Sequence, residues 1–264
     1  MKVVDCFTFY NELDLLEIRL NELDEVVDNF VIVEAEKTHQ NNTKPLYYQE
    51  ASDEPRFKKW KDRIINIVVP TSSFTEDTWF NENTQFRAIR DGLTQFSQDD
   101  LIMIGAADEI PNKDMVREAR EKLERPMCFN QKLYYFYLNT LYNHNGSCIW
   151  PGTTIQKLSQ IPEDIVNLIS TRPGLPPIFD GGWHFSYMGN EKYALDKIHS
   201  YAHDEFKGHV KEEDFKKFRE ELSDPVGRGP NKSHCIAIEG EDCLPIYVRE
   251  NKEKFKEYIR HGEL

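Results

Sequence analysis

The sequence is poor in positive charge. Its 264 residues include 33 Lys and Arg against 46 Asp and Glu, so the formal net charge is −13. Sequence-independent binding to nucleic acid or to an anionic membrane depends on clustered Lys and Arg, which release counterions. The composition argues against both classes, and we expect no nucleic acid and no membrane among the partners. An anionic ligand has to be held by local groups.

A secretory leader, long apolar runs and paired cysteines are also missing. The opening residues MKVVDCFTFYNELD contain one Lys, and their apolar stretch is interrupted by Asp5, which is not the layout of a signal peptide. The five cysteines form no C-x-x-C pair, which fits a reducing compartment better than a disulfide framework. We therefore expect a cytoplasmic protein.

Only 39% of the residues are hydrophobic, but 12% are aromatic and supply bulk for a sizeable core. No internal repeat, low-complexity tract or long linker is visible. The length fits one large domain or two small ones. The simplest interpretation is a single mixed α/β domain over residues 1–264 with a helical C-terminal appendage.

The first 125 residues alternate strand and helix patterns. Apolar residues spaced by three and four over 13–27 predict a helix, and Phe86, Ile89, Leu93 and Phe96 predict another. Short apolar runs predict strands at 3–10, 30–33, 64–69 and 101–104. The alternation favours a parallel sheet.

After Pro126 the pattern changes. The aromatic-rich runs MCFNQKLYYFYLN and SCIWPGTTI predict antiparallel strands added to the parallel half. The tail returns to helix, with Phe215, Phe218 and Leu222 spaced by three and four, and it ends in the charged stretch VRENKEKFKEYI.

Acidic residues follow several predicted strands: Glu12, Glu34 and the pair Asp108-Glu109. Ligands of open α/β sheets bind beyond the carboxyl ends of the parallel strands, so these side chains are expected to meet in one crevice. Carboxylates there suit a divalent cation, which in turn neutralises a phosphate. The alternative for each residue is a solvated loop charge.

The segments YNELDLLEIRLNELDEVVDNFVIVEAEKT, ADEIPN and GGWHFSYMG resemble glycosyltransferase family 17. This is the family of the β-1,4-N-acetylglucosaminyltransferase that adds the bisecting residue to N-glycans, with bacterial and viral relatives. The resemblance spans about Asp5 to Gly189 and, more weakly, Leu244 to Phe255. It implies a GT-A type fold, a nucleotide-sugar donor, a glycan acceptor, and inverting, metal-dependent transfer, with residues 1–125 as the nucleotide-sugar-binding half and 126–264 as the acceptor side.

One position departs from the family. The fourth strand of the family usually leads into Asp-x-Asp-Glu-Ile-Pro, whereas this chain has Ala106-Ala107-Asp108-Glu109-Ile110-Pro111. The first carboxylate of the signature, which helps to hold the metal and the diphosphate, is missing. Either Ala106 was introduced to disable the enzyme, which we favour, or it marks a natural relative with altered metal use.

The resemblance also implies roles for individual residues. Asp108 would hold Mn²⁺ or Mg²⁺ at the donor diphosphate. Glu12 and Glu34 would face the nucleoside. Arg87 matches an Arg of the family that would neutralise the donor or orient Asp108.

The GGWHFSYMG segment combines a glycine pair, which lets backbone approach a ligand, with an aromatic face for a sugar. Trp183 and His184 are therefore candidates for donor binding, against a buried turn and a structural His. His203 shares a helical spacing with His199 and is a candidate metal ligand. Ser200 stands where a zinc protease needs Glu, so that chemistry is not expected.

The catalytic base remains open among Asp180, Glu191 and Glu109, besides the catalytic carboxylate Asp108. The reaction needs one carboxylate to take the acceptor proton. No G-x-S-x-G elbow and no G-x-G-x-x-G after the first strand is present, which argues against hydrolase and dinucleotide-binding functions. Two rival functions stay open: a catalytically inactive carbohydrate-binding protein, for which Ala106 is the evidence, and a metal-dependent nucleotidyltransferase.

Overall fold

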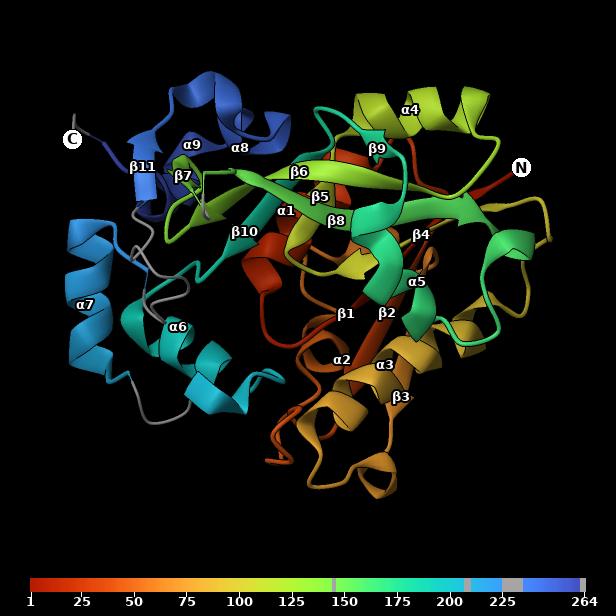
Figure 1. Ribbon diagram of the computed structural model, residues 1–264, viewed down its shortest axis with the longest axis horizontal. Helices are drawn as coiled ribbons and strands as arrows, with labels where there is room; N and C mark the ends of the chain where they lie inside the picture. Colours follow the sequence, from red (N-terminus) through yellow and green to blue (C-terminus); the bar gives the residue numbers. More distant parts are fainter. Residues whose placement is uncertain (144–145, 207–209, 225–234, 262–264) are drawn as a thin grey trace.

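The computed structural model describes residues 1–143, 146–206, 210–224 and 235–261 (Figure 1). Its centre is a parallel array in the order β4-β1-β2-β3. These strands are β1 (Val3–Thr8), β2 (Asn29–Ala35), β3 (Ile64–Val69) and β4 (Leu101–Ala106). The four predicted strands and their parallel pairing are confirmed.

Antiparallel strands extend this array on the β4 side. Strand β8 (Ile149–Lys157) pairs with β4, and β6 (Met127–Tyr135) pairs with β8, as the aromatic-rich runs predicted. Beyond them lie β7 (Thr140–Tyr142) and β11 (Cys235–Ile238). The described residues thus form a mixed sheet in an α/β fold, which confirms the predicted class.

Three short strands leave this path. Strand β10 (Gly182–Ser186) runs parallel to β6 and antiparallel to β5 (Glu109–Pro111), and β9 (Pro177–Ile178) pairs with β6. The GGWHFS segment is therefore mainly a strand and not a buried turn. Its pairing with β5 brings His184 opposite Glu109.

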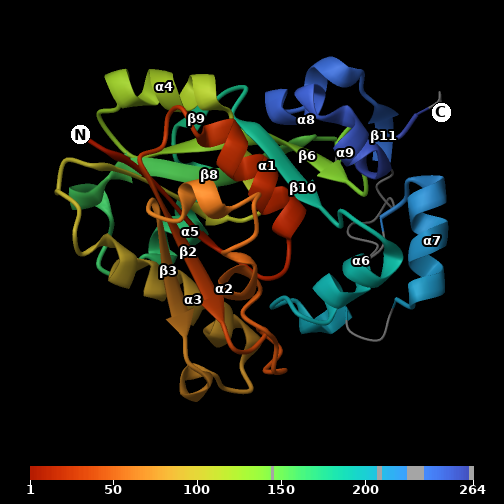
Figure 2. The ribbon, with the colours of Figure 1, turned by 180° about the vertical axis from the view of Figure 1, so that it is seen from behind.

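Successive side chains of the parallel strands point to opposite faces of the sheet, and helices cover both faces. Val3 and Phe7 pack with α1 (Leu13–Leu23) and α4 (Lys113–Lys122) on one face. Val4 and Cys6 pack with α3 (Thr78–Leu93) and α5 (Val166–Thr171) on the other. Accordingly α5 lies in front of the sheet in Figure 1 and α1 lies in front in Figure 2.

The predicted helices form, with shifted ends. Helix α3 ends at Leu93, so Phe96 lies beyond it, although it stays buried against the same core. The remaining helices are α2 (Tyr47–Ala51), α6 (Glu191–Ile198), α7 (Glu212–Glu221), α8 (Ile246–Glu250) and α9 (Lys252–Phe255), with short 3₁₀ turns between elements. Within the described residues, none of the helices has the length and apolar character that a membrane crossing requires.

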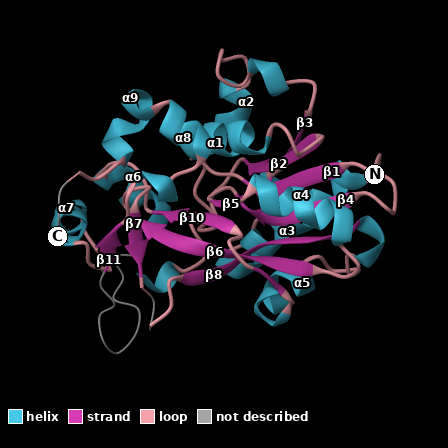
Figure 3. Ribbon diagram, turned by 90° about the horizontal axis from the view of Figure 1, so that it is seen from above, coloured by secondary structure: helices cyan, strands magenta, loops and turns pink. Residues whose placement is uncertain are grey.

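The C-terminal helices pack back on the N-terminal half. Figure 3 shows α8 beside α1. The Tyr247 hydroxyl donates to Glu17 Oε1 at 2.6 Å, and the Tyr247 N–H donates to Glu22 Oε2 at 3.2 Å. Both carboxylates belong to α1, so the appendage is anchored to the helix that follows the first strand.

Candidate active site

A cavity of about 400 Å³ opens at the carboxyl ends of β1, β2 and β4. Thr8 ends β1 and is followed by Phe9 and Tyr10, Lys37 to His39 follow β2, and Ala106 ends β4 and is followed by Ala107 to Glu109. This is the edge at which open α/β sheets bind their ligands. The far wall comes from the second half of the chain, through β8, β10, α6 and the segment after α6.

A buried arginine holds the backbone of the loop after β4. Arg19 of α1 is fully buried and forms a bidentate ion pair with Asp5, with both contacts at 2.7 Å. Its Nη1 also donates to the carbonyl oxygens of Ala106 and Glu109, each at 2.7 Å, and of Ala107 at 3.3 Å. Asp108 therefore lies on a loop whose backbone carbonyl groups are held by the buried Arg19 guanidinium group.

Asp108 is paired with a cation from α6. Its Oδ2 lies 2.5 Å from Lys197 Nζ and 3.5 Å from His184 Nε2. Burial alone would raise the pKa of Asp108, but the adjacent Lys197 and His184 hold that pKa well below its usual value. Asp108 is thus an ionised carboxylate, 5% exposed, in the wall of the cavity.

Glu109 is held on both carboxylate oxygens. Oε1 accepts from Trp150 Nε1 at 2.7 Å and lies 3.0 Å from Arg172 Nη2. Oε2 accepts from Arg172 Nη1 and from the N–H of Ala106, each at 3.1 Å. With 2% exposure and these contacts, Glu109 positions Arg172 and the loop, and it has no free oxygen for an acceptor proton.

Glu82 of α3 is the carboxylate in the lining with a pKa near neutrality. Burial raises the pKa of Glu82 to about 7; Arg172 opposes the rise and Glu109 adds to it. Among the described residues we find no hydrogen bond or ion pair that occupies Glu82. A carboxylate with this pKa exchanges a proton readily at neutral pH.

The lining carries as many cations as carboxylates, whereas the whole chain has a net charge of −13. The cations are Lys37, Lys44, Arg172 and Lys197, and the carboxylates are Glu12, Glu82, Asp108 and Glu109. Because Glu82 is partly protonated near neutral pH, the balance there is slightly positive. The cavity is therefore a local site at which this acidic chain can bind an anion.

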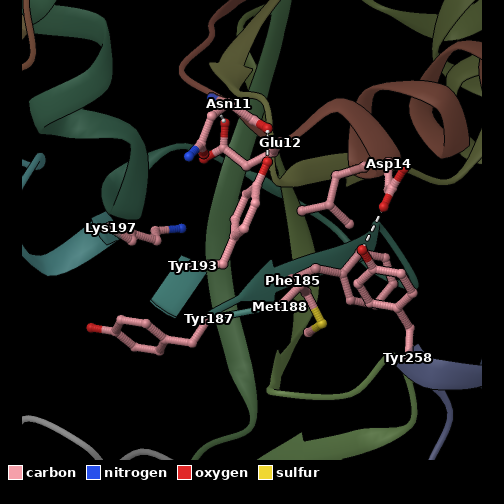
Figure 4. Close-up of a pocket in the computed structure, with 10 residues that line it drawn as sticks. Asn11, Glu12, Asp14, Phe185, Tyr187, Met188, Tyr193, Lys197 and Tyr258 are labelled. Atoms are coloured by element: carbon pink, nitrogen blue, oxygen red, sulfur yellow. Dashed lines mark hydrogen bonds between the residues drawn. The ribbon is translucent and has the colours of Figure 1, made fainter. Parts of the chain in front are cut away.

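A smaller hollow of about 40 Å³ adjoins the cavity (Figure 4). The two share Glu12, Tyr187 and Lys197. Tyr193, whose hydroxyl donates to Asn11 O at 2.8 Å, and Tyr258, whose hydroxyl donates to Asp14, line the smaller one. Lys197 thus stands between two hollows.

The structure brings six of the predicted site residues to the cavity: Glu12, Ala106, Asp108, Glu109, His184 and His203. Glu34 lies elsewhere. Its buried carboxylate accepts from the N–H groups of Tyr48 (2.7 Å) and Gln49 (3.0 Å), so it caps α2 and does not face a nucleoside. Arg87 is also elsewhere, exposed, and paired with Asp164 at 2.9 Å and not with Asp108.

Trp183 alternates with His184 on β10 and therefore points away from the cavity. Its Nε1 donates to Cys243 O at 2.5 Å, and its ring packs near α8. The neighbouring glycines serve strand packing and not ligand approach, because a Cβ on Gly182 would lie 2.2 Å from the Ile110 oxygen. Trp150 is the tryptophan beside His184, with ring centroids 4.8 Å apart.

Two of the proposed bases are remote from the cavity lining. Asp180 is exposed at the turn before β10, with its backbone oxygen accepting from Asn112. Glu191 lies in the first turn of α6, with its Oε1 3.5 Å from Arg219 of α7. Neither position favours proton transfer in the cavity.

The donor set does not fit the divalent cation that the resemblance implies. Within residues 1–143, 146–206, 210–224 and 235–261, no three His, Cys, Asp or Glu side chains gather in a way that could hold a metal ion. Asp108 is already paired with Lys197, and Ala106 supplies no carboxylate. His203 lines the cavity but pairs with Glu205 at 2.6 Å, and because α6 ends at Ile198 it does not share a helix with His199.

Several lining residues escaped the sequence analysis, above all Lys197, Arg172, Trp150 and Glu82. Lys197 and Arg172 carry no motif, and their partners lie 89 and 63 residues away. Glu82 lies four residues after Thr78 and four before Phe86, both of which are buried, so its position on the inward side of α3 was a usable signal.

Comparison with known proteins identifies the family. The model of glycosyltransferase family 17 matches residues 1–231. The β-1,4-mannosyl-glycoprotein 4-β-N-acetylglucosaminyltransferases of Rattus norvegicus and Homo sapiens are each 27% identical over 121 residues, which is 44% of this chain and 22% and 23% of theirs. The matched segment thus spans less than a quarter of these curated relatives.

Among solved structures, galactosyltransferase LgtC in complex with donor and acceptor sugar analogs aligns with 100% of this chain and 98% of its own. The sequence identity is 10% and the TM-score is 0.35, too low to carry an argument. The family model spans most of the chain and includes the cavity residues after β1, β2 and β4. On that match the chain belongs to glycosyltransferase family 17.

Proposed function

We propose that this chain is an inverting glycosyltransferase of GT-A type that moves N-acetylglucosamine from a UDP-sugar to a hydroxyl of a glycan acceptor. Family membership supports the reaction class, and the names of the curated relatives support this sugar and a mannosyl acceptor. A cytoplasmic location belongs to the same proposal. It is supported by the cysteines with described side chains, Cys6, Cys128, Cys148 and Cys243, which are free thiols.

The observation that carries the proposal is the cavity at the ends of the parallel strands. Its lining contains as many cations as carboxylates, although the chain as a whole is strongly acidic. A nucleotide sugar needs an aromatic or apolar surface for its base and cations for its diphosphate. Tyr10 and Phe86 supply such surfaces in the lining, and Arg172 and Lys197 supply positive charge. The volume of about 400 Å³ is in the range of ligand pockets.

The chemistry needs a base for the acceptor hydroxyl. As the acceptor oxygen attacks the anomeric carbon, its proton must pass to a group with a pKa near the working pH. Glu82 meets this condition in the lining, with a pKa of about 7. We assign it this role in place of Asp180 and Glu191. The smaller hollow, which Tyr193, Tyr258 and Asp14 line, adjoins this cavity beside Lys197 (Figure 4).

A transfer assay tests the proposal. The chain is incubated with UDP-N-acetylglucosamine, UDP-galactose or UDP-glucose and a β-mannoside acceptor, and the products are analysed by NMR for sugar and anomeric configuration. We expect a β-linked N-acetylglucosamine product and release of UDP. A product with retained α configuration contradicts the inverting mechanism, and release of sugar 1-phosphate in place of UDP indicates a nucleotidyltransferase.

Ala106 keeps one second candidate function open, a carbohydrate-binding protein without transfer activity. The same assay separates the two. A chain that binds UDP-sugar and acceptor but forms no product with any of the three donors is the inactive binder.

A further inference from the structure

The position of Lys197 suggests how this site manages without the missing carboxylate. Lys197 reaches from α6 to the loop after β4, where its Nζ lies 2.5 Å from Asp108 Oδ2. Figure 4 shows its side chain extending into the space beside Asn11 and Glu12. The contact places a positive charge on the one carboxylate that remains of the Asp-x-Asp signature, and Ala106, which replaces the other, also lines the cavity.

The pair is built into the protein. The Asp108 side chain is 8% exposed and that of Lys197 is 23% exposed, so bulk water screens them little. An ammonium group has three N–H donors, and a carboxylate oxygen occupies one. The others are available to oxygens of a ligand in the cavity. A lysine is a well-suited point charge for phosphate groups.

Arg172 supplies a second charge. Its guanidinium is fixed by both oxygens of Glu109 at 3.0 and 3.1 Å and by the Trp150 ring, 5.4 Å from the ring centroid. The side chain is 13% exposed and lines the same cavity. A cation fixed in this way needs little rearrangement to meet an anion.

We propose, building on the proposed function, that this chain binds the nucleoside diphosphate without a divalent cation, and that Lys197 and Arg172 stabilise the leaving diphosphate. A divalent cation at Asp108 would have to displace the Lys197 ammonium group from this carboxylate and would be repelled by its charge. In the transfer step, the acceptor oxygen forms a bond to the anomeric carbon while the bond from that carbon to the diphosphate oxygen breaks. The electron pair of the broken bond stays on the diphosphate, and the acceptor proton passes to Glu82.

Calorimetric titration with UDP tests the proposal in buffer with EDTA and in buffer with Mn²⁺. We expect the dissociation constants in the two buffers to agree within about twofold. Lys197→Met should weaken binding in EDTA by about 10- to 100-fold, the range for loss of a hydrogen bond to a charged group. Lys197→Arg should restore part of the affinity. Lys192→Met is the matched control, since Lys192 is exposed on the same helix, and it should bind as the unaltered chain does.

Lys197→Met gives a second readout. It removes the ammonium group from Asp108, so UDP binding by this variant should become stronger with Mn²⁺ than with EDTA. Thermal melts and near-UV circular dichroism establish that each variant is folded. If a variant does not fold, the comparison of EDTA and Mn²⁺ in the unaltered chain still decides the question.

The outcomes separate this proposal from the proposed function. UDP binding that requires Mn²⁺ in the unaltered chain overturns the metal-free site and leaves the glycosyltransferase in place. No UDP binding in either buffer overturns both. In the transfer assay, we expect turnover in EDTA. If turnover instead requires Ala106→Asp together with Mn²⁺, the chain is an inactivated metal-dependent enzyme and the proposal is wrong.

Discussion

Replacing Arg19 with Met probes the support beneath the site. Arg19 is fully buried, pairs with both oxygens of Asp5, and donates to carbonyl oxygens of Ala106, Ala107 and Glu109. Methionine keeps much of the length and apolar volume but removes all of these donors. The change leaves the Asp5 carboxylate charged and unpaired in the core, and it frees the loop that carries Asp108.

The expected cost follows from this burial. Removing one partner of a buried ion pair costs about 3–5 kcal/mol, because the other charge stays desolvated and uncompensated. The matched control is Arg56→Met. Arg56 pairs with Asp14 at a similar 2.7 Å, but its side chain is 24% exposed, and an ion pair near the surface contributes roughly 1 kcal/mol or less.

Urea unfolding followed by circular dichroism measures both free energies of unfolding. The double variant Asp5→Leu/Arg19→Met completes the test, because replacing a whole buried pair by apolar groups is often close to neutral. It should be more stable than Arg19→Met alone. Equal losses for Arg19→Met and Arg56→Met, or a double variant less stable than Arg19→Met, would refute the reasoning.

Two further predictions rest on groups with shifted pKa values in the cavity. Glu82→Gln should lower kcat by about 10²- to 10⁴-fold and leave the dissociation constant for UDP unchanged. The unaltered chain should show an inflection near pH 7 in its pH–rate profile, with the higher rate above that pH, and the variant should lack it. A profile unchanged by the variant excludes Glu82 as the base. Burial lowers the pKa of His39 from 6.5 to about 4, so the unfolded chain binds this proton first and stability falls as the pH drops from about 6.5 to 4, by up to about 3 kcal/mol. His39→Gln should remove that contribution, and an identical fall in its pH-dependent melting temperatures would contradict the assignment.

The parallel half of the fold was predictable because its signals are local. Apolar runs such as IINIVV are recognisable as strands from their own residues, and the leucines of 13–23 place one stripe on a helix. Strand β10 was not predictable in the same way. Its partners are Pro111 to Glu109 on one side and Lys132 to Tyr135 on the other, and only the folded chain brings them together.

The site shows the same division. A polar residue after a strand marks the ligand edge of a sheet, and this signal located Asp108 and Glu12. The same signal placed Glu34 wrongly in the site, because a carboxylate at a strand end also serves to cap the next helix, as Glu34 does for α2. The sequence does not distinguish the two uses, since both depend on where the following loop turns.

The charge balance changes how Ala106 is interpreted. A metal-dependent site is built with excess carboxylate charge, which the cation then neutralises so that a diphosphate can approach. In this cavity Lys197 already neutralises Asp108 and Arg172 already neutralises Glu109. A carboxylate at position 106 would add a negative charge, and Lys197 and Arg172 are already paired with other carboxylates. It would repel a diphosphate unless a metal ion neutralised it. Alanine at 106 and lysine at 197 therefore act in the same direction, since each leaves the cavity less negative and so more favourable for an anion.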